Sequence, residues 1–453
     1  MYATINPANG QTTREFDAAT RDEIDFAVET LHNGFQASRH VSPEERAPAL
    51  VKAAELFRER ADELAATITQ EMGKRNRDAL GEVEIVAQIF EYYGTKGPEM
   101  LADRPVEDST QNDVVQYRPM GVLLGIMPWN YPLYQLARFA APNLVLGNSV
   151  LIKPAPSTPA TAIAFADVLS SASLGPDVYQ TLLAMTDDVE GLIRDERIAG
   201  VSLTGSEGAG SKVAAVAGEE VKKVVLELGG SDPFIILDEE NLEEIAEVAV
   251  EARMENMGQA CNSPKRFIVM EEAFAPFVAA AKRLLEKNYH PGDPQNAQTS
   301  LAPLSSEAAL EKIADQVGRA VEQGATLETG GHRLDREGFY YAPTLLTGVT
   351  PEMDAYHEEL FGPVLVVHSA NSDEECIRLA NDSAFGLGAA VFGGDPERAE
   401  AVGESLEVGM VSINRPEGSE AELPFGGVKK SGIGRELGRL GAVEFANQRL
   451  FRA

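Results

Sequence analysis

The stretch GVLLGIMPWNYPLYQLARFAAPNLVLGNSVLIK, residues 121–153, decides the fold. An apolar run of strand length at 121–127 is followed by a helical stretch at 131–146 and a second apolar run at 149–153. Strands that are apolar on both faces and are joined through a helix are typical of a parallel sheet with helices on both sides. These residues therefore predict a strand–helix–strand unit.

The same alternation continues to residue 228. We expect helices at 159–171 and 208–217 and strands at 178–184, 201–204 and 223–228. Alternating strands and helices predict an α/β fold with a parallel sheet. The segment 120–228 is therefore interpreted as one unit of the dinucleotide-binding type.

A second alternation begins near residue 241. We expect helices at 241–256, 274–287 and 374–380, and strands at 267–270, 364–368 and 389–392. The first hundred residues have the apolar spacing of helices. The fold class expected is thus α/β, with two doubly wound domains and an additional helical segment.

The charge of the chain excludes several classes of partner. The 453 residues carry a formal net charge of −32, whereas nucleic-acid binding needs a basic surface and an anionic membrane repels an acidic chain. A disordered acidic tail is also excluded, because 44% of the residues are hydrophobic. Thirteen lysines against 26 arginines, with the excess of acidic residues, favour adaptation to a salt-rich cytoplasm, since salt screens self-repulsion.

Cysteine content and the N-terminal residues indicate the compartment. The two cysteines, Cys261 and Cys376, exclude a disulfide scaffold and most cysteine-based metal sites. The N-terminus lacks a basic segment followed by an apolar one, so no signal peptide is expected. The most apolar stretch, 121–152, contains proline, asparagine and arginine and is no membrane span. We expect a soluble, cytoplasmic protein.

Two side chains are candidates for chemistry. Cys261 follows a glycine turn near the end of a predicted helix and is either a nucleophile or, as lone cysteines usually are, a small buried apolar residue. Glu227 lies inside an apolar strand that ends at Gly229 and Gly230. It either points to solvent or is a buried general base with a raised pKa.

Two turns at predicted strand ends add candidates, because ligands bind at the carboxyl ends of parallel strands. Trp129 and Asn130 lie between Pro128 and Pro132, where an asparagine amide can donate to a developing oxyanion; the alternative is a rigid turn. The glycine-rich turn 204–210 joins a strand to a helix and suits a pyrophosphate, although a lone glycine turn is a weak signal.

Together these motifs resemble the aldehyde dehydrogenase superfamily over essentially the whole chain. The 34-residue interval from Glu227 to Cys261 is similar to the base-to-nucleophile spacing of that family. Further matching motifs are Lys153-Pro154, Glu358-Glu359-Leu360-Phe361-Gly362-Pro363, Pro424-Phe425-Gly426-Gly427 and Lys430-Ser431-Gly432.

The resemblance implies a role for each matching position. Cys261 is the expected nucleophile that adds to an aldehyde, Asn130 the oxyanion donor, and Glu227 the base that activates water to hydrolyse the thioester. The resemblance assigns cofactor binding to Trp129, Lys153, Gly205, Ser206, Gly229, Glu359 and Phe361.

The resemblance leaves the cofactor open between NAD and NADP. NAD-preferring relatives often have a glutamate three residues after the lysine of the Lys-Pro motif, whereas Pro156 is found here. Glu207, beside the phosphate turn, is also unexpected. The absence of a carboxylate at position 156 permits either cofactor.

Within the superfamily the chain is most similar to bacterial succinate-semialdehyde dehydrogenases. Arg138 lies eight residues after Asn130, and it is expected either to bind the distal carboxylate of such a substrate or to form a structural salt bridge. Another short aldehyde, or transfer of the thioester to coenzyme A, is the alternative; Glu227 argues against the transfer.

Unrelated activities have less support. A Cys–His hydrolase would need a histidine, and none of the six lies in a motif near Cys261. A non-catalytic protein of the same fold would not need Cys261, Glu227 and Asn130 together.

The resemblance also implies domain boundaries and an assembly. Residues 1–103 and 120–229 would form the NAD(P)-binding domain, 230–431 the catalytic domain, and 104–119 with 432–453 the oligomerisation strands. The expected assembly is a homodimer or homotetramer.

Overall fold

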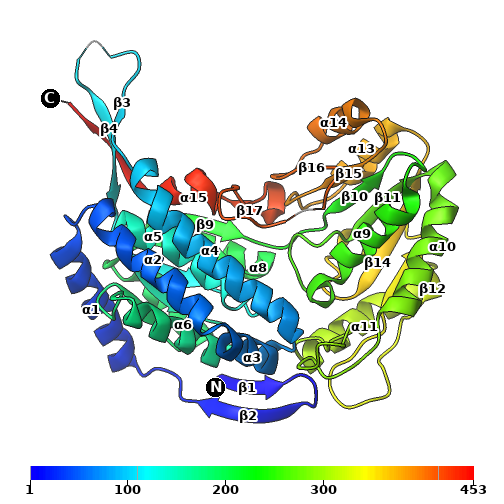
Figure 1. The fold of residues 1–453 in the computed structure, drawn as a ribbon, viewed down its shortest axis with the longest axis horizontal. Coiled ribbons are helices and arrows are strands. Elements are labelled where there is room, and N and C mark those ends of the chain that lie inside the picture. Colours follow the sequence, from blue (N-terminus) through cyan, green and yellow to red (C-terminus); the bar gives the residue numbers. More distant parts are fainter. Residues whose placement is uncertain (1, 110, 417, 453) are drawn as a thin grey trace.

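Two α/β lobes lie side by side in the computed structural model, with a thin arm projecting from the first (Figure 1). The structure describes residues 2–109, 111–416 and 418–452. Met1 and Ala453, the outer ends of the expected domain ranges, lie outside this description. No helix in the described part of the chain is long and apolar enough to cross a membrane.

The first lobe contains a six-stranded sheet in the order β17-β9-β8-β5-β6-β7. Its strands are β5 (Val122–Ile126), β6 (Ser149–Lys153), β7 (Tyr179–Thr181), β8 (Ile198–Thr204), β9 (Lys223–Glu227) and β17 (Gly432–Ile433). All neighbours are parallel except β17, which runs antiparallel to β9. This confirms the parallel sheet expected from residues 121–153.

Helices cover both faces of this sheet. The helices α1 (Arg21–Ser38), α7 (Val189–Arg194) and α8 (Glu207–Glu219) share a core with Leu124 and Leu151. The opposite core, which contains Leu123 and Val150, takes α2 (Pro43–Glu59), α3 (Ala61–Met72), α4 (Asn76–Met100), α5 (Tyr134–Leu146) and α6 (Pro159–Ser171). Every residue of α5 is buried, which explains why its sequence is mostly apolar; Gln135, Arg138 and Asn143 are the exceptions.

Local signals specify several helix ends. Ser42 and Glu45 form a capping box at the start of α2, and Gly73 ends α3 in a left-handed conformation. The N-terminal hairpin β1 (Tyr2–Asn6) and β2 (Gln11–Phe16) was not expected. The six residues of β2 are polar except its last and mostly exposed, so no apolar alternation marks them as a strand.

The second lobe contains a seven-stranded sheet in the order β12-β13-β14-β11-β10-β15-β16. Its strands are β10 (Pro233–Ile236), β11 (Arg266–Met270), β12 (Thr326–Thr329), β13 (Thr344–Thr347), β14 (Val364–Ala370), β15 (Ala390–Phe392) and β16 (Ser412–Ile413). The neighbours are parallel except β12 and β13.

Alternate residues of β10 enter two different cores, which makes this lobe doubly wound as well. Phe234 packs with α9 (Leu242–Met254), α10 (Glu271–Asn288) and α11 (Glu307–Glu322). Ile235 packs on the other side with α13 (Asp373–Asn381) and α14 (Pro396–Glu404). The short segments Thr186–Asp188, Glu255–Gly258 and Lys429–Ser431 are 3-10 turns, and α12 (Asp354–His357) is a single turn.

The arm is a three-stranded antiparallel sheet in the order β18-β4-β3. It consists of β3 (Arg104–Pro105), β4 (Val114–Pro119) and β18 (Ala446–Phe451). Only the last part of the expected segment 432–453 is found here. Gly432–Ile433 pairs with β9, and α15 (Gly438–Glu444) packs on α4 and α5, because its Gly441 and Ala442 face the first core.

A buried carboxylate joins three segments of the first lobe. Glu71 on α3 accepts hydrogen bonds from Thr4 Oγ1 (2.8 Å) on β1 and from three donors at the start of α6. These donors are Ala160 N (2.8 Å), Thr161 N (2.8 Å) and Thr161 Oγ1 (2.7 Å). Glu71 thus caps α6 in place of a local side chain.

We predict that Glu71→Ala lowers the free energy of unfolding by about 3 kcal/mol, because buried backbone donors at the start of α6 lose their acceptor. Urea denaturation followed by circular dichroism measures the change. Glu63→Ala on the same helix is the control; its exposed pair with Arg60 is worth at most about 1 kcal/mol. Equal effects of the two substitutions would contradict the capping role.

Candidate functional site

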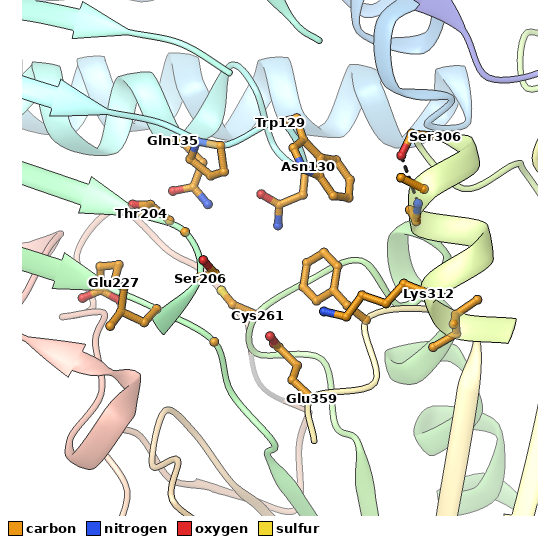
Figure 2. A pocket seen from close by; sticks show the side chains of 18 of the residues that line it. Trp129, Asn130, Gln135, Thr204, Ser206, Glu227, Cys261, Ser306, Lys312 and Glu359 are labelled. Carbon is orange, nitrogen blue, oxygen red and sulfur yellow. Dashed lines mark hydrogen bonds between the residues drawn. The ribbon is translucent and has the colours of Figure 1, made fainter. Parts of the chain in front are cut away.

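A cavity of about 380 Å³ lies where the carboxyl ends of β8 and β9 face the second lobe (Figure 2). Asn130, Glu227, Cys261 and Glu359 all line it. Its other walls are Pro128, Trp129, Gln135, Thr204, Gly205, Ser206, Leu228, Gly229, Ser306, Ala308, Ala309, Lys312, Ile313, Gln316 and Phe361. The structure therefore brings most of the predicted site residues together.

The loop that carries Cys261 has an unusual backbone. Asn256, Met257 and Gly258 have φ angles of 46°, 56° and 73°, so three successive residues are left-handed. A Cβ atom on Gly258 would lie 2.1 Å from the carbonyl oxygen of Gly362. Glycine is thus required both by its conformation and by the close approach of the 358–364 loop.

Amide side chains join this loop to the turn after β5. Asn130 Nδ2 donates to Gln259 O (3.1 Å), and Asn256 Nδ2 donates to Asn130 O (2.9 Å). Gln259 Nε2 in turn donates to Asn256 O (3.1 Å). Asn130 is therefore held beside the nucleophile loop with its amide at the cavity that Cys261 also lines.

Opposing charges act on the Cys261 thiol. The pKa of Cys261 is raised to about 11. Burial is the largest cause and Glu227 and Asp232 add to it, whereas Arg138 and Lys265 act in the opposite direction. Since the thiolate is the nucleophile, nearby cations are needed to favour it at neutral pH.

Glu227 ends β9 and is 2% exposed, which excludes the solvent-facing alternative. Neither carboxylate oxygen has a hydrogen-bond partner among the described residues. Burial raises the pKa of Glu227 well above its ordinary value; Arg138 and Arg435 oppose this and Glu436 adds to it. A buried carboxylate with a raised pKa, lining the cavity, has the properties of a general base.

The region around Ser206 fits a dinucleotide. Ser206 is the N-cap of α8, and the first backbone N–H groups of a helix suit a phosphate. Gly205 and Gly229 line the same wall. Glu207 is half-exposed and pairs with Lys430 (3.8 Å) instead of lining the cavity.

The far end of the cavity suits a ribose and a flat ring. Glu359 Oε1 accepts a hydrogen bond from Gly230 N (3.1 Å), which leaves capacity for ribose hydroxyls. Trp129 and Phe361 meet edge to face with ring centroids 5.9 Å apart. Phe361, Glu359 and Cys261 thus line one space, as a nicotinamide ring next to a thiol requires.

Lys153 does not line this cavity. It ends β6, is 5% exposed, and its Nζ donates to Pro154 O (3.1 Å). Burial lowers the pKa of Lys153. Its role in cofactor binding stays a prediction.

A second cavity, also of about 380 Å³, is adjacent to Cys261. Cys261 and Gln135 line both cavities. The second is further lined by Lys74, Arg77, Asp78, Gly81, Glu82, Ile85, Tyr131, Tyr134, Arg138, Glu255, Asn256, Asn262, Gly418, Ser419 and Phe425. The sequence predicted Arg138 among these residues, and Tyr131 and Phe425 lie in motifs that it indicated. Most of the others, such as Lys74 and Ser419, carry no local signal.

Arg138 lines this second cavity but is fully buried. It forms an ion pair with Glu436, and its Nη2 lies 3.4 Å from Thr204 Oγ1. The guanidinium carbon lies 4.5 Å from the ring centre of Phe425. The structure thus contains the salt bridge that the sequence left open, and carboxylate binding by Arg138 stays a prediction.

Comparisons with known proteins agree with this geometry. The model of the aldehyde dehydrogenase family matches residues 1–450. A succinate-semialdehyde dehydrogenase [NADP(+)] of Deinococcus radiodurans is 47% identical over 100% of this chain and 94% of its own. A probable enzyme of the same name from Synechocystis is 42% identical over 98% of both chains.

Among solved structures, succinic semialdehyde dehydrogenase from Streptococcus pyogenes in complex with NADP+ matches with a TM-score of 0.98 and 37% identity over the full length of both chains. A betaine aldehyde dehydrogenase of Staphylococcus aureus in complex with NAD+ matches with a TM-score of 0.95 and 29% identity, over 99% of this chain and 91% of its own.

We predict that Gly258→Ala displaces the Cys261 loop, because its φ is left-handed and the new methyl group meets Gly362 O. The rate of Cys261 alkylation by iodoacetamide and the melting temperature should both change. Gly318→Ala is the control, since a Cβ there meets nothing within 4 Å. An alkylation rate of Gly258→Ala equal to that of the control would contradict this account of the loop.

Proposed function

Since the chain belongs to the aldehyde dehydrogenase family and is an NAD(P)-dependent oxidoreductase acting on aldehydes, we propose that it oxidises succinate semialdehyde to succinate with NADP+. The observation that carries this proposal is the position of Cys261 between two cavities. One cavity suits a dinucleotide, and the other leads an aldehyde to the same sulfur.

The residues around Cys261 supply each part of the reaction. The Cys261 thiolate adds to the aldehyde carbon, and the amide of Asn130, with the Cys261 backbone N–H, donates to the oxyanion that forms. Bound nicotinamide supplies the acceptor for the hydride that leaves the same carbon. A thioester of Cys261 then remains, and Glu227 takes a proton from the water that hydrolyses it.

The proposed preference for NADP+ rests on two observations. Lys153 is followed by Pro154, Ala155 and Pro156, so no carboxylate is present at 156 to repel a 2′-phosphate. The relatives from Deinococcus radiodurans and Synechocystis are named for NADP(+). Either dinucleotide has the same fit at Ser206, Gly229 and Glu359.

The proposed substrate rests on the second cavity. Lys74 and Arg138 face it as buried cations, each already paired with a glutamate. We propose that the carboxylate of succinate semialdehyde approaches Arg138 and shares its guanidinium with Glu436. Another short aldehyde is the alternative, and delivery of the thioester to coenzyme A is disfavoured by the presence of Glu227.

The proposed assembly is a homodimer or homotetramer formed through the arm. In the described part of the chain, β18 is an edge strand, and its Leu450 and Phe451 are 59% and 46% exposed. An exposed apolar edge favours pairing with a second copy. A cytoplasmic location also stays a prediction, based on the cysteine content. Adaptation to a salt-rich cytoplasm is a further prediction, supported by the charge of −32.

Glu227→Gln should permit one burst of reduced cofactor and then slow the steady state by roughly 10²–10⁴-fold, because hydrolysis loses its base. Stopped-flow absorbance of NADPH measures both phases, and Cys261→Ala should abolish both. Burial raises the pKa of Glu227, so its basic form is lost as the pH falls through that raised pKa, and wild-type turnover should fall with it. A steady state of Glu227→Gln equal to that of the wild type would contradict the base assignment.

Arg138→Met combined with Glu436→Gln should raise the KM for succinate semialdehyde at least about tenfold more than that for butyraldehyde, because a hydrogen bond to a charged group is lost. The double change avoids leaving Glu436 as an unpaired buried charge. Glu436→Gln alone is the matched control. A parallel change of both KM values would eliminate Arg138 as the carboxylate site.

A further inference from the structure

Lys265 is a buried cation directly behind the nucleophile. It lies four residues after Cys261, immediately before β11, and is 1% exposed. Its Nζ donates to three backbone carbonyls of the nucleophile loop: Cys261 O (2.7 Å), Ala260 O (3.1 Å) and Ser263 O (3.1 Å). An ammonium has three N–H donors, so this loop satisfies all of them.

The loop therefore wraps around the ammonium group. Burying a lysine is costly unless its charge is compensated. Lys265 Nζ lies 3.5 Å from Glu359 Oε1, the carboxylate proposed to bind the nicotinamide ribose. This contact links the loop of Cys261 to the loop of Glu359.

Arg253 is a second buried cation that links the Cys261 loop to the loop of Glu359. Arg253 donates to Ser263 Oγ (3.0 Å) and to Val364 O (2.7 Å), and its Nη2 donates to Leu360 O and Gly362 O (both 2.5 Å). Arg253 thus holds the 360–364 loop against the nucleophile loop. Since its contact in the nucleophile loop is a hydroxyl group at Ser263, Lys265 is the cation that contacts Cys261 itself.

We propose that Lys265 is a positioning residue that holds the Cys261 loop through its three carbonyls and stabilises the Cys261 thiolate with its positive charge. This inference rests on the proposed function only for its use in catalysis. The contacts themselves concern the free protein.

The charges around Cys261 and Lys265 are consistent with a lowering of the Cys261 pKa by Lys265. Burial and the carboxylates Glu227 and Asp232 raise the pKa of Cys261, and Arg138 and Lys265 lower it. Cys261 also faces Tyr134. The charges that face Lys265 are Glu359, Asp232, Arg253 and Cys261. Arg138 is itself paired with Glu436, so its charge is partly compensated and does not replace that of Lys265.

The test is a pH titration of the Cys261 thiolate by its ultraviolet absorbance, with the spectrum of Cys261→Ala subtracted. Lys265→Met should move the titration to higher pH by about one unit, equivalent to about tenfold less thiolate at a given pH. The rate of iodoacetamide alkylation of Cys261, determined by peptide mass analysis, should fall about tenfold at the same pH.

Two further variants separate charge from folding. Lys265→Gln keeps N–H donors for the carbonyls but removes the charge. It should therefore fold even if Lys265→Met does not, and its Cys261 titration should also move to higher pH. Lys222→Met is the matched control: its Nζ also donates to two carbonyls, Ile193 O (2.6 Å) and Asp195 O (2.5 Å), at the opposite end of β9. It should leave the titration unchanged.

The proposal is overturned if the Cys261 thiolate of Lys265→Gln titrates at the same pH as that of the wild type. It is also overturned if Lys222→Met moves the titration as far as Lys265→Gln does. Neither aldehyde nor cofactor enters these measurements. Absence of turnover with succinate semialdehyde would therefore contradict only the proposed function. An unchanged Cys261 titration would contradict only the role of Lys265.

Discussion

The site around Cys261 depends on a buried arginine, Arg138, that lies among buried carboxylates. Arg138 pairs with Glu436, and its charge opposes the rise in pKa that burial imposes on both Cys261 and Glu227. Burial favours the neutral form of a thiol and of a carboxylate, whereas the proposed reaction needs each of them ionised in turn. The interior therefore needs fixed positive charge, which Arg138 and Lys265 provide.

The fold explains how these groups come together. In the first sheet the ligand-binding turns follow the carboxyl ends of parallel strands. The second lobe faces them with the loops that precede its parallel strands β11 and β14. Glu227 comes from the first sheet, and Cys261 from the loop that precedes β11 of the second. The site thus exists only between the lobes, where Cys261 lines two cavities.

Much of the fold was predictable because its signals are local. The apolar runs 121–127 and 149–153 contain β5 and β6, and the residue types of Ser42 and Gly73 mark helix ends locally. The hairpin β1–β2 was missed, because a polar two-stranded ribbon has no apolar period. The tail was only partly predicted, since the pairing of Gly432–Ile433 with β9 depends on a contact between distant segments.

The sequence by itself determined the α/β class, the order of the motifs and the identity of Cys261, Glu227 and Asn130 as candidates, because periodicity and motif spacing are properties of the chain. Only the tertiary structure decided that Glu227 is buried, that Arg138 is paired with Glu436, and that Lys265 contacts the nucleophile loop. Burial and charge compensation depend on contacts with residues from distant segments of the chain, so no local sequence pattern predicts them.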